Sequence, residues 1–199
     1  MKQTIFDNDI FTTTVTNLET FDKHSGMFLK QMLNLSISVP MQDHVQSRGE
    51  ATTTVQSADI FRNLPGFRLL QSALMNYLEE AKHILFPESS GKLELIRAWA
   101  NIMHKGSTTV SHHHQVQADP YMVCIFYLEA PAQSAQLAII NDSTQNLECI
   151  DFPEEKLHYI SPHPHMLLCH RNHITHAVSE HLSDDRRISI MLEMAVNPK

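Results

Sequence analysis

The second part of the chain is a series of short apolar segments with the composition of β-strands. Between residues 92 and 199, the runs are LELIRAWANIM, MVCIFYLEA, AQLAIIN, KLHYI, HMLLCH and RISIMLEMAV, separated by Pro, Gly, Asn, Asp and Ser. Several short strands in series, with no helical pattern between them, predict a sandwich or a jelly roll. The mouth of such a barrel is a common ligand site, because side chains project into it from different strands.

The first part of the chain carries two helical patterns. Apolar residues recur loosely at helical intervals over residues 18–35 and strongly over residues 67–85, whereas residues 12–15 look extended. Pro65-Gly66 begins the second pattern and Pro87 ends it, as expected because proline cannot continue the helical hydrogen-bond ladder. We therefore expect one mainly β domain with flanking α-helices, in which residues 1–91 form a helical support packed on a core of residues 92–199.

Length and charge limit the classes of partner. The chain has 199 residues, 42% of them hydrophobic, which is enough for one core. Its net charge of −7 argues against bulk nucleic-acid binding. The first residues contain no apolar signal core and no stretch approaches membrane-spanning length, which predicts a cytoplasmic protein without membrane association. Exposed strand edges or a helical face could pair two copies, so a homodimer is compatible with the sequence.

Histidines make the most specific pattern. His112 and His114 lie one residue apart at a predicted strand end, and because successive strand side chains alternate faces, both imidazoles point the same way while His113 points the other way. His176, from a distant strand, would complete a three-imidazole metal site. The alternative is a solvated His-rich loop that binds metals only casually.

Arg187 follows His176 after about the length of one short strand. Arg187 and Ser189 occupy the same predicted strand face, so a guanidinium fork and a hydroxyl are available to one carboxylate. Arg186 then points outward. The sequence therefore predicts a metal site combined with a carboxylate site.

These motifs together resemble a known family. Trp99-Ala100-Asn101, Lys105-Gly106, His112-x-His114, the strand Ile125-Phe126-Tyr127-Leu128, His176-Ala177-Val178 and Arg187-Ile188-Ser189-Ile190 follow one another in that order. Their order and spacing resemble a family of 2-oxoglutarate and iron(II)-dependent oxygenases that reads W-x-N, Gly, H-x-H, a YY strand, H-x-V and R-I-S-I. The resemblance spans roughly residues 49–194.

The resemblance implies a double-stranded β-helix, the cupin-like jelly roll, with N-terminal helices packed on it. It implies Fe(II), 2-oxoglutarate and O2 as metal, cosubstrate and oxidant, with His112, His114 and His176 as the metal ligands. Arg187 and Ser189 would bind the far carboxylate of 2-oxoglutarate, and Asn101 would look toward it. The expected reaction hydroxylates a C–H bond of a small molecule or a peptide side chain and releases succinate and CO2.

His114 stands where the wider superfamily has a carboxylate ligand. It is either a third metal ligand or a residue that contacts the substrate or lies outside the ligand set, in which case water or the cosubstrate would fill the vacant position. Two alternatives from other classes also stay open. A neutral set of three histidines also resembles cupin-type dioxygenases that do not use 2-oxoglutarate. A non-catalytic metal-binding jelly roll would keep the same pattern. Sequence alone does not separate ligand-orienting roles from solvent exposure for the neighbouring histidines, which are His163, His165, His170 and His173. Trp99 and Tyr127 are expected to pack in the core.

Overall fold

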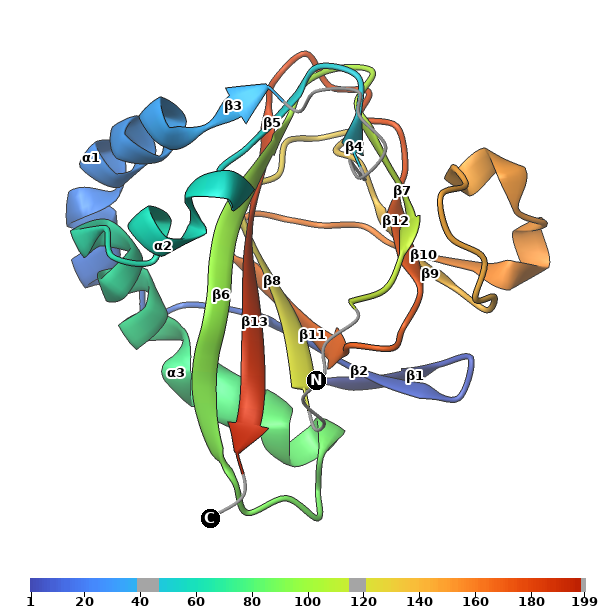
Figure 1. The fold of residues 1–199 in the computed structure, drawn as a ribbon, viewed down its shortest axis with the longest axis horizontal. Coiled ribbons are helices and arrows are strands. Elements are labelled where there is room, and N and C mark those ends of the chain that lie inside the picture. Colours follow the sequence, from blue (N-terminus) through green and yellow to red (C-terminus); the bar gives the residue numbers. More distant parts are fainter. Residues whose placement is uncertain (39–46, 115–120, 198–199) are drawn as a thin grey trace.

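Two antiparallel β-sheets enclose the centre of the molecule in the computed structural model, which describes residues 1–38, 47–114 and 121–197 (Figure 1). The larger sheet has the strand order β1 (Lys2–Ile5), β2 (Asn8–Thr14), β11 (Met166–Arg171), β8 (Tyr121–Glu129), β13 (Arg187–Asn197), β6 (Lys92–Met103), β5 (Ala51–Thr53) and β3 (Ile37–Ser38). The smaller sheet has the order β10 (Leu157–Ile160), β9 (Leu137–Ile140), β12 (His176–Val178), β7 (Thr108–His112) and β4 (Ser47–Arg48). This arrangement is the predicted jelly roll.

Helices cover the outer face of the larger sheet. The long helices are α1 (Glu19–Leu35) and α3 (Pro65–Leu85), and the short α2 (Ala58–Phe61) lies beside β6 (Figure 1). Three short 3-10 turns complete the described helices: η1 (Val55–Ser57), η2 (Cys149–Asp151) and η3 (Glu154–Lys156). The smaller sheet faces the other side of the larger one, so a second core lies between the two sheets.

The central strand β13 shows how the sequence supplies both cores. Ile188, Ile190 and Leu192 pack in the cluster beneath the helices, whereas Met191 packs between the sheets. Because side chains alternate along a strand, the odd-numbered residues of β13 share the inner face, which points between the two sheets. The polar residues of that inner face are Arg187, Ser189 and Glu193, all of them buried.

The predicted elements are confirmed over the described residues, with one difference. Both helices and all six predicted strands form close to the expected positions. However, the segment before residue 92 is less helical than the expected support, because β2 pairs with β11 and β5 pairs with β6. The larger sheet therefore contains strands from both sides of the predicted 91/92 boundary. Short edge strands such as β1 carry too few residues for a clear period, which is why the sequence does not reveal them.

Close packing of α1 on α3 predicts a position-specific stability effect. A Cβ added at Gly66 would lie 2.5 Å from the Cβ of Phe28. We expect Gly66→Ala to lower the free energy of unfolding by about 1–3 kcal/mol through overpacking. Gly26, in the exposed part of α1, has nothing within 4 Å of an added Cβ, so Gly26→Ala should instead stabilise by about 0.5–1 kcal/mol. Urea denaturation checks both, and equal effects would contradict this packing.

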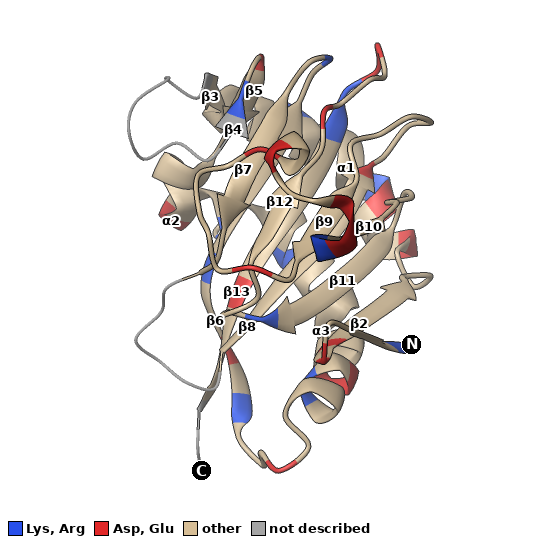
Figure 2. Ribbon diagram, turned by 90° about the vertical axis from the view of Figure 1, so that its right-hand side faces the viewer, with Lys and Arg blue, Asp and Glu red and all other residues tan. Residues whose placement is uncertain are grey.

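Charged residues are distributed over many elements. Figure 2 shows Lys and Arg residues interspersed with Asp and Glu residues along the ribbon. Within the described residues, no helix is both long and apolar enough to cross a membrane.

Candidate metal centre and carboxylate site

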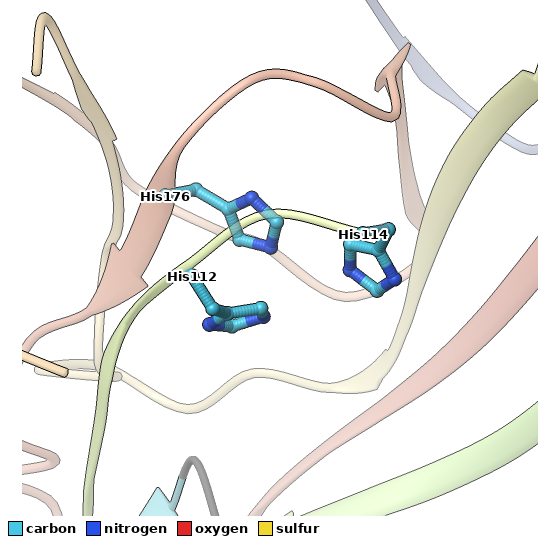
Figure 3. A group of neighbouring side chains, drawn as sticks. All are labelled: His112, His114 and His176. Carbon is cyan, nitrogen blue, oxygen red and sulfur yellow. The ribbon is translucent and has the colours of Figure 1, made fainter. Parts of the chain in front are cut away.

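Three histidines converge between the two sheets. His112 ends β7 and His176 begins β12, and the two are direct partners in the register of the smaller sheet. His114 follows β7 by two residues, and its backbone N–H donates to the carbonyl of Asn172 at 3.0 Å. One ring nitrogen from each of the three lies within 4.8 Å of the others (Figure 3). The structure thus brings the predicted triplet together.

The backbone sets the tautomer of the two strand histidines. The Nδ1 of His112 lies 2.8 Å from the carbonyl oxygen of Val110, and that of His176 lies 3.0 Å from the carbonyl oxygen of Ile174. A carbonyl only accepts, so each Nδ1 carries the hydrogen and each Nε2 keeps its lone pair. Both imidazoles are therefore prepared as Nε2 ligands.

A carboxylate sets the tautomer of the third. The Nδ1 of His114 lies 2.7 Å from Oε1 of Glu193, and the hydroxyl of Tyr121 donates to Oε2 at 3.0 Å. Burial alone would raise the pKa of Glu193, but hydrogen bonds from His114 and Tyr121 and the charge of Arg97 together lower it. An ionised carboxylate only accepts, so Nδ1 of His114 donates. Its Nε2 is buried and has no partner among the described residues.

This donor set fits a divalent transition metal. Metals bind the neutral form of imidazole. Burial, with smaller contributions from neighbouring imidazoles, lowers the pKa of His112 to about 4 and that of His176 well below its usual value. Buried polar atoms are normally paired, so a role in core packing alone would not explain the unpartnered Nε2 of His114. A metal ion would provide its partner. Imidazole donors suit iron and its neighbours in the transition series.

A fourth imidazole adjoins the triplet. His170, on β11, is fully buried, and its ring centroid lies 4.8 Å from that of His176. Its Nδ1 donates to the carbonyl of Arg171 at 2.7 Å, and its Nε2 has no partner among the described residues. Of the other nearby histidines, His163 and His173 are exposed beside β2, whereas His165 is half-buried. The group whose nitrogens all lie close together does not include His170.

Arg187 is a buried cation without an acidic partner in the described chain. It is 2% exposed, and its guanidinium carbon lies 4.9 Å from the ring centroid of Tyr127. Its Nη1 contacts Oγ of Ser189 at 3.4 Å and the sulfur of Met103 at 3.2 Å, while its Nε has no partner among the residues that the structure describes. Glu193 lies six residues along the same strand, roughly 20 Å away at strand rise. An unpaired buried charge is costly, so this pocket suits an anion from outside the chain.

The remaining predicted residues surround these groups. Arg186 points outward and forms an ion pair with Glu129. Asn101 is the register partner of Ser189, and its Oδ1 accepts a hydrogen bond from Thr53 at 2.9 Å. Trp99 and Tyr127 are buried between the sheets as expected, with Trp99 6.2 Å from the ring of His114.

Glu193 is the site residue that the sequence reasoning missed. It lies 79 residues from His114, and only the sheet register brings the two together. A signal was present in the period of β13, because Glu193 shares the odd-numbered face with Arg187 and Ser189 in an otherwise apolar strand. An acidic residue on an inward face is rarely placed there without a partner.

The buried imidazoles predict a stability loss in mild acid for the metal-free protein. Burial lowers the pKa of His170 to about 3, whereas an unfolded histidine titrates near 6.5. Below pH 6.5 the unfolded chain binds protons at these histidines that the folded chain does not, so the free energy of unfolding falls as the pH drops from 6.5 toward 4. Each such histidine contributes a slope of about 1.4 kcal/mol per pH unit. Urea denaturation is measured over this pH range in the presence of a chelator. The free energy of unfolding should depend less steeply on pH for His170→Leu than for the wild type, and an equal pH dependence would refute the prediction.

A family model supports the motif order found above. The model described as "Putative 2OG-Fe(II) oxygenase" matches residues 97–193, just under half of the chain. The matched region contains all three converging histidines and both Arg187 and Glu193. No curated protein matches the chain by sequence.

Solved structures share the fold over nearly the whole chain. A Pseudomonas putida prolyl-4-hydroxylase is 11% identical with a TM-score of 0.61, covering 94% of this chain and 92% of its own. HygX from Streptomyces hygroscopicus, with nickel, 2-oxoglutarate and hygromycin B bound, is 10% identical with a TM-score of 0.66, covering 96% and 83%. A Trichoplax adhaerens prolyl hydroxylase in complex with a hypoxia inducible factor peptide is 16% identical with a TM-score of 0.62, covering 94% and 83%.

Residues 97–193 therefore resemble the family of 2-oxoglutarate and iron(II)-dependent oxygenases, and the chain has the jelly-roll fold of the solved structures named above. Both findings support an enzyme of the dioxygenase type.

Proposed function

We propose that His112, His114 and His176 bind iron(II) through their Nε2 atoms, and that Arg187 and Ser189 bind the far carboxylate of 2-oxoglutarate. The observation that carries the proposal is the guanidinium of Arg187, which is buried on the inner face of β13 with no acidic partner among the described residues. A carboxylate ligand would provide the missing charge through paired hydrogen bonds. This favours a 2-oxoglutarate enzyme over a three-histidine dioxygenase, for which Arg187 would have no ligand to bind.

Asn101 belongs to the same proposal. Directly opposite residues on neighbouring antiparallel strands project to the same face, and Asn101 is opposite Ser189. Thr53 occupies its carbonyl oxygen, which orients the side-chain amide as a donor. We assign that donor to the cosubstrate.

The protein's own groups would orient the reactants and exclude water. Iron(II) and 2-oxoglutarate, when bound, supply the oxidation, in which O2 and 2-oxoglutarate yield succinate, CO2 and a hydroxylated C–H bond of the substrate. The Nδ1 hydrogen bonds fix the three imidazoles before any ligand arrives, and the burial of Arg187 strengthens its pairing with a carboxylate.

The substrate class is a small molecule or a peptide side chain. The related folds support both, since HygX was solved with hygromycin B and the Trichoplax adhaerens enzyme with a peptide fragment. A cytoplasmic location, a possible homodimer and the absence of bulk nucleic-acid or membrane binding remain predictions from the sequence.

An anaerobic titration tests the proposal. Iron(II) and then 2-oxoglutarate are added to metal-free protein while the visible absorbance is recorded. A charge-transfer band that requires both additions supports chelated cosubstrate, and oxygen should then release succinate. Iron binding without such a band would favour the three-histidine dioxygenase. If no iron binds, the metal-centre assignment is wrong.

A further inference from the structure

The three proposed ligands are not held in the same way. His112 and His176 each donate to the carbonyl two residues earlier on the same segment, so local backbone fixes their rings. His114 lies beyond the end of β7, and a side chain of the opposite sheet, Glu193, holds its ring. The orientation of His114 therefore depends on a contact that local structure does not provide.

Glu193 is built to make that contact. Its side chain is 12% exposed, and the hydroxyl of Tyr121 holds its second oxygen while the first accepts from His114. Tyr121 is fully buried between the sheets. Both carboxylate oxygens are thus fixed, and rotation of the carboxylate would break both bonds.

The charge of Glu193 has a chemical consequence at the metal centre. Three neutral imidazoles leave the full double charge of a divalent ion uncompensated, whereas two histidines and one carboxylate reduce it by one. A carboxylate that accepts the Nδ1 hydrogen of a ligating imidazole makes that imidazole more basic. Glu193 is the carboxylate hydrogen-bonded to the group of three histidines within the described residues.

We propose that Glu193 is a positioning residue that acts through His114, holding its Nε2 toward the other two imidazoles and supplying the negative charge that a carboxylate ligand would bring. This inference rests on the proposed three-histidine metal centre. Tyr121 supports it by holding the carboxylate in place.

Metal affinity provides a readout that does not depend on turnover. Cobalt(II) is titrated into the full-length metal-free protein and its visible absorption is followed. We expect Glu193→Gln, which keeps an acceptor but loses the charge, to weaken cobalt binding about 10-fold, and Glu193→Leu to weaken it by up to about 100-fold. Glu129→Gln is the matched control, because it removes a carboxylate whose ion pair within the described part of the chain is with the outward Arg186. Its cobalt affinity should equal that of the wild type.

A double-mutant cycle separates action through His114 from a general structural effect. In the His114→Ala background, Glu193→Gln should cause no further loss of cobalt affinity, and the absorption bands should no longer respond to it. Thermal unfolding of each metal-free variant reports whether the fold is intact. A variant that fails to fold is replaced by Tyr121→Phe, which frees one carboxylate oxygen and should weaken cobalt binding only a few-fold.

The outcomes distinguish the two proposals. If the wild type binds cobalt and loses it on His176→Ala, but Glu193→Gln has no effect, the role of Glu193 is overturned and the metal centre stands. Equal losses from Glu193→Gln with and without His114 would also overturn it, because the residue would then act independently of that histidine. If the wild type binds no cobalt, both proposals fail.

Discussion

Replacing Arg187 with methionine is expected to abolish 2-oxoglutarate binding while leaving metal binding intact. Removing one partner of a buried charged pair costs about 2–5 kcal/mol, or roughly one and a half to three and a half orders of magnitude in affinity. The charge-transfer band should therefore vanish at cosubstrate concentrations that saturate the wild type. The neighbouring Arg186→Met is the matched control, because Arg186 pairs with Glu129 at the surface. Its band should be unchanged.

The same substitution should stabilise the ligand-free protein. Arg187 is buried without an acidic partner among the described residues, and replacing buried charges with apolar side chains of similar volume often raises stability by about 1–4 kcal/mol. Thermal unfolding of metal-free Arg187→Met should show a higher midpoint than the wild type. Opposite effects on ligand binding and stability are the signature of a residue kept for function. A band that survives with normal affinity would refute the carboxylate site and favour a dioxygenase without this cosubstrate.

Local pattern was sufficient to predict the main elements of this fold and half of its site. Strand alternation at Arg187 and Ser189 predicts that the two side chains share a face, and both are buried on the inner face of β13, because a period of two depends only on the chain itself. His114 lies beyond the end of β7, so its orientation depends on Glu193 instead. The structure brings His176 beside His112 through the register of β12 on β7. The sequence motifs indicated that His176 lies near His112, but only the pairing of β12 with β7 determines their relative position.

What the sequence did not predict depends on long-range register. Glu193 reaches His114 because β13 lies in the centre of the larger sheet, opposite the end of β7. His170 reaches His176 for a similar reason, since β11 brings an inward imidazole toward β12. A short local period carries no information about which strand lies opposite. Likewise, β2 joins the sheet by pairing with β11, and β1 joins it by pairing with β2. The pattern of these strands is too short to indicate either pairing.

Removal of the imidazole of His176 should have the largest effect on metal binding. His176 is the register partner of His112, and its ring centroid lies 4.3 Å from that of His112. Loss of a ligand should exceed the 10–100-fold loss typical of a residue that only orients one, so we expect His176→Ala to weaken cobalt(II) binding by more than about 100-fold. Titration of metal-free protein, followed by visible absorption, measures this. An affinity within 10-fold of the wild type would exclude His176 as a ligand.

His170→Leu is the informative comparison for this prediction. It removes a buried imidazole that touches His176 but stands outside the group of three, so cobalt affinity should change by no more than a few-fold. A loss as large as that of His176→Ala would indicate four imidazole ligands. A six-coordinate ion would then keep only two open positions, which a chelating cosubstrate alone would fill, leaving none for oxygen. The expected contrast between the two variants therefore tests whether the centre retains the open position that an oxygenase needs.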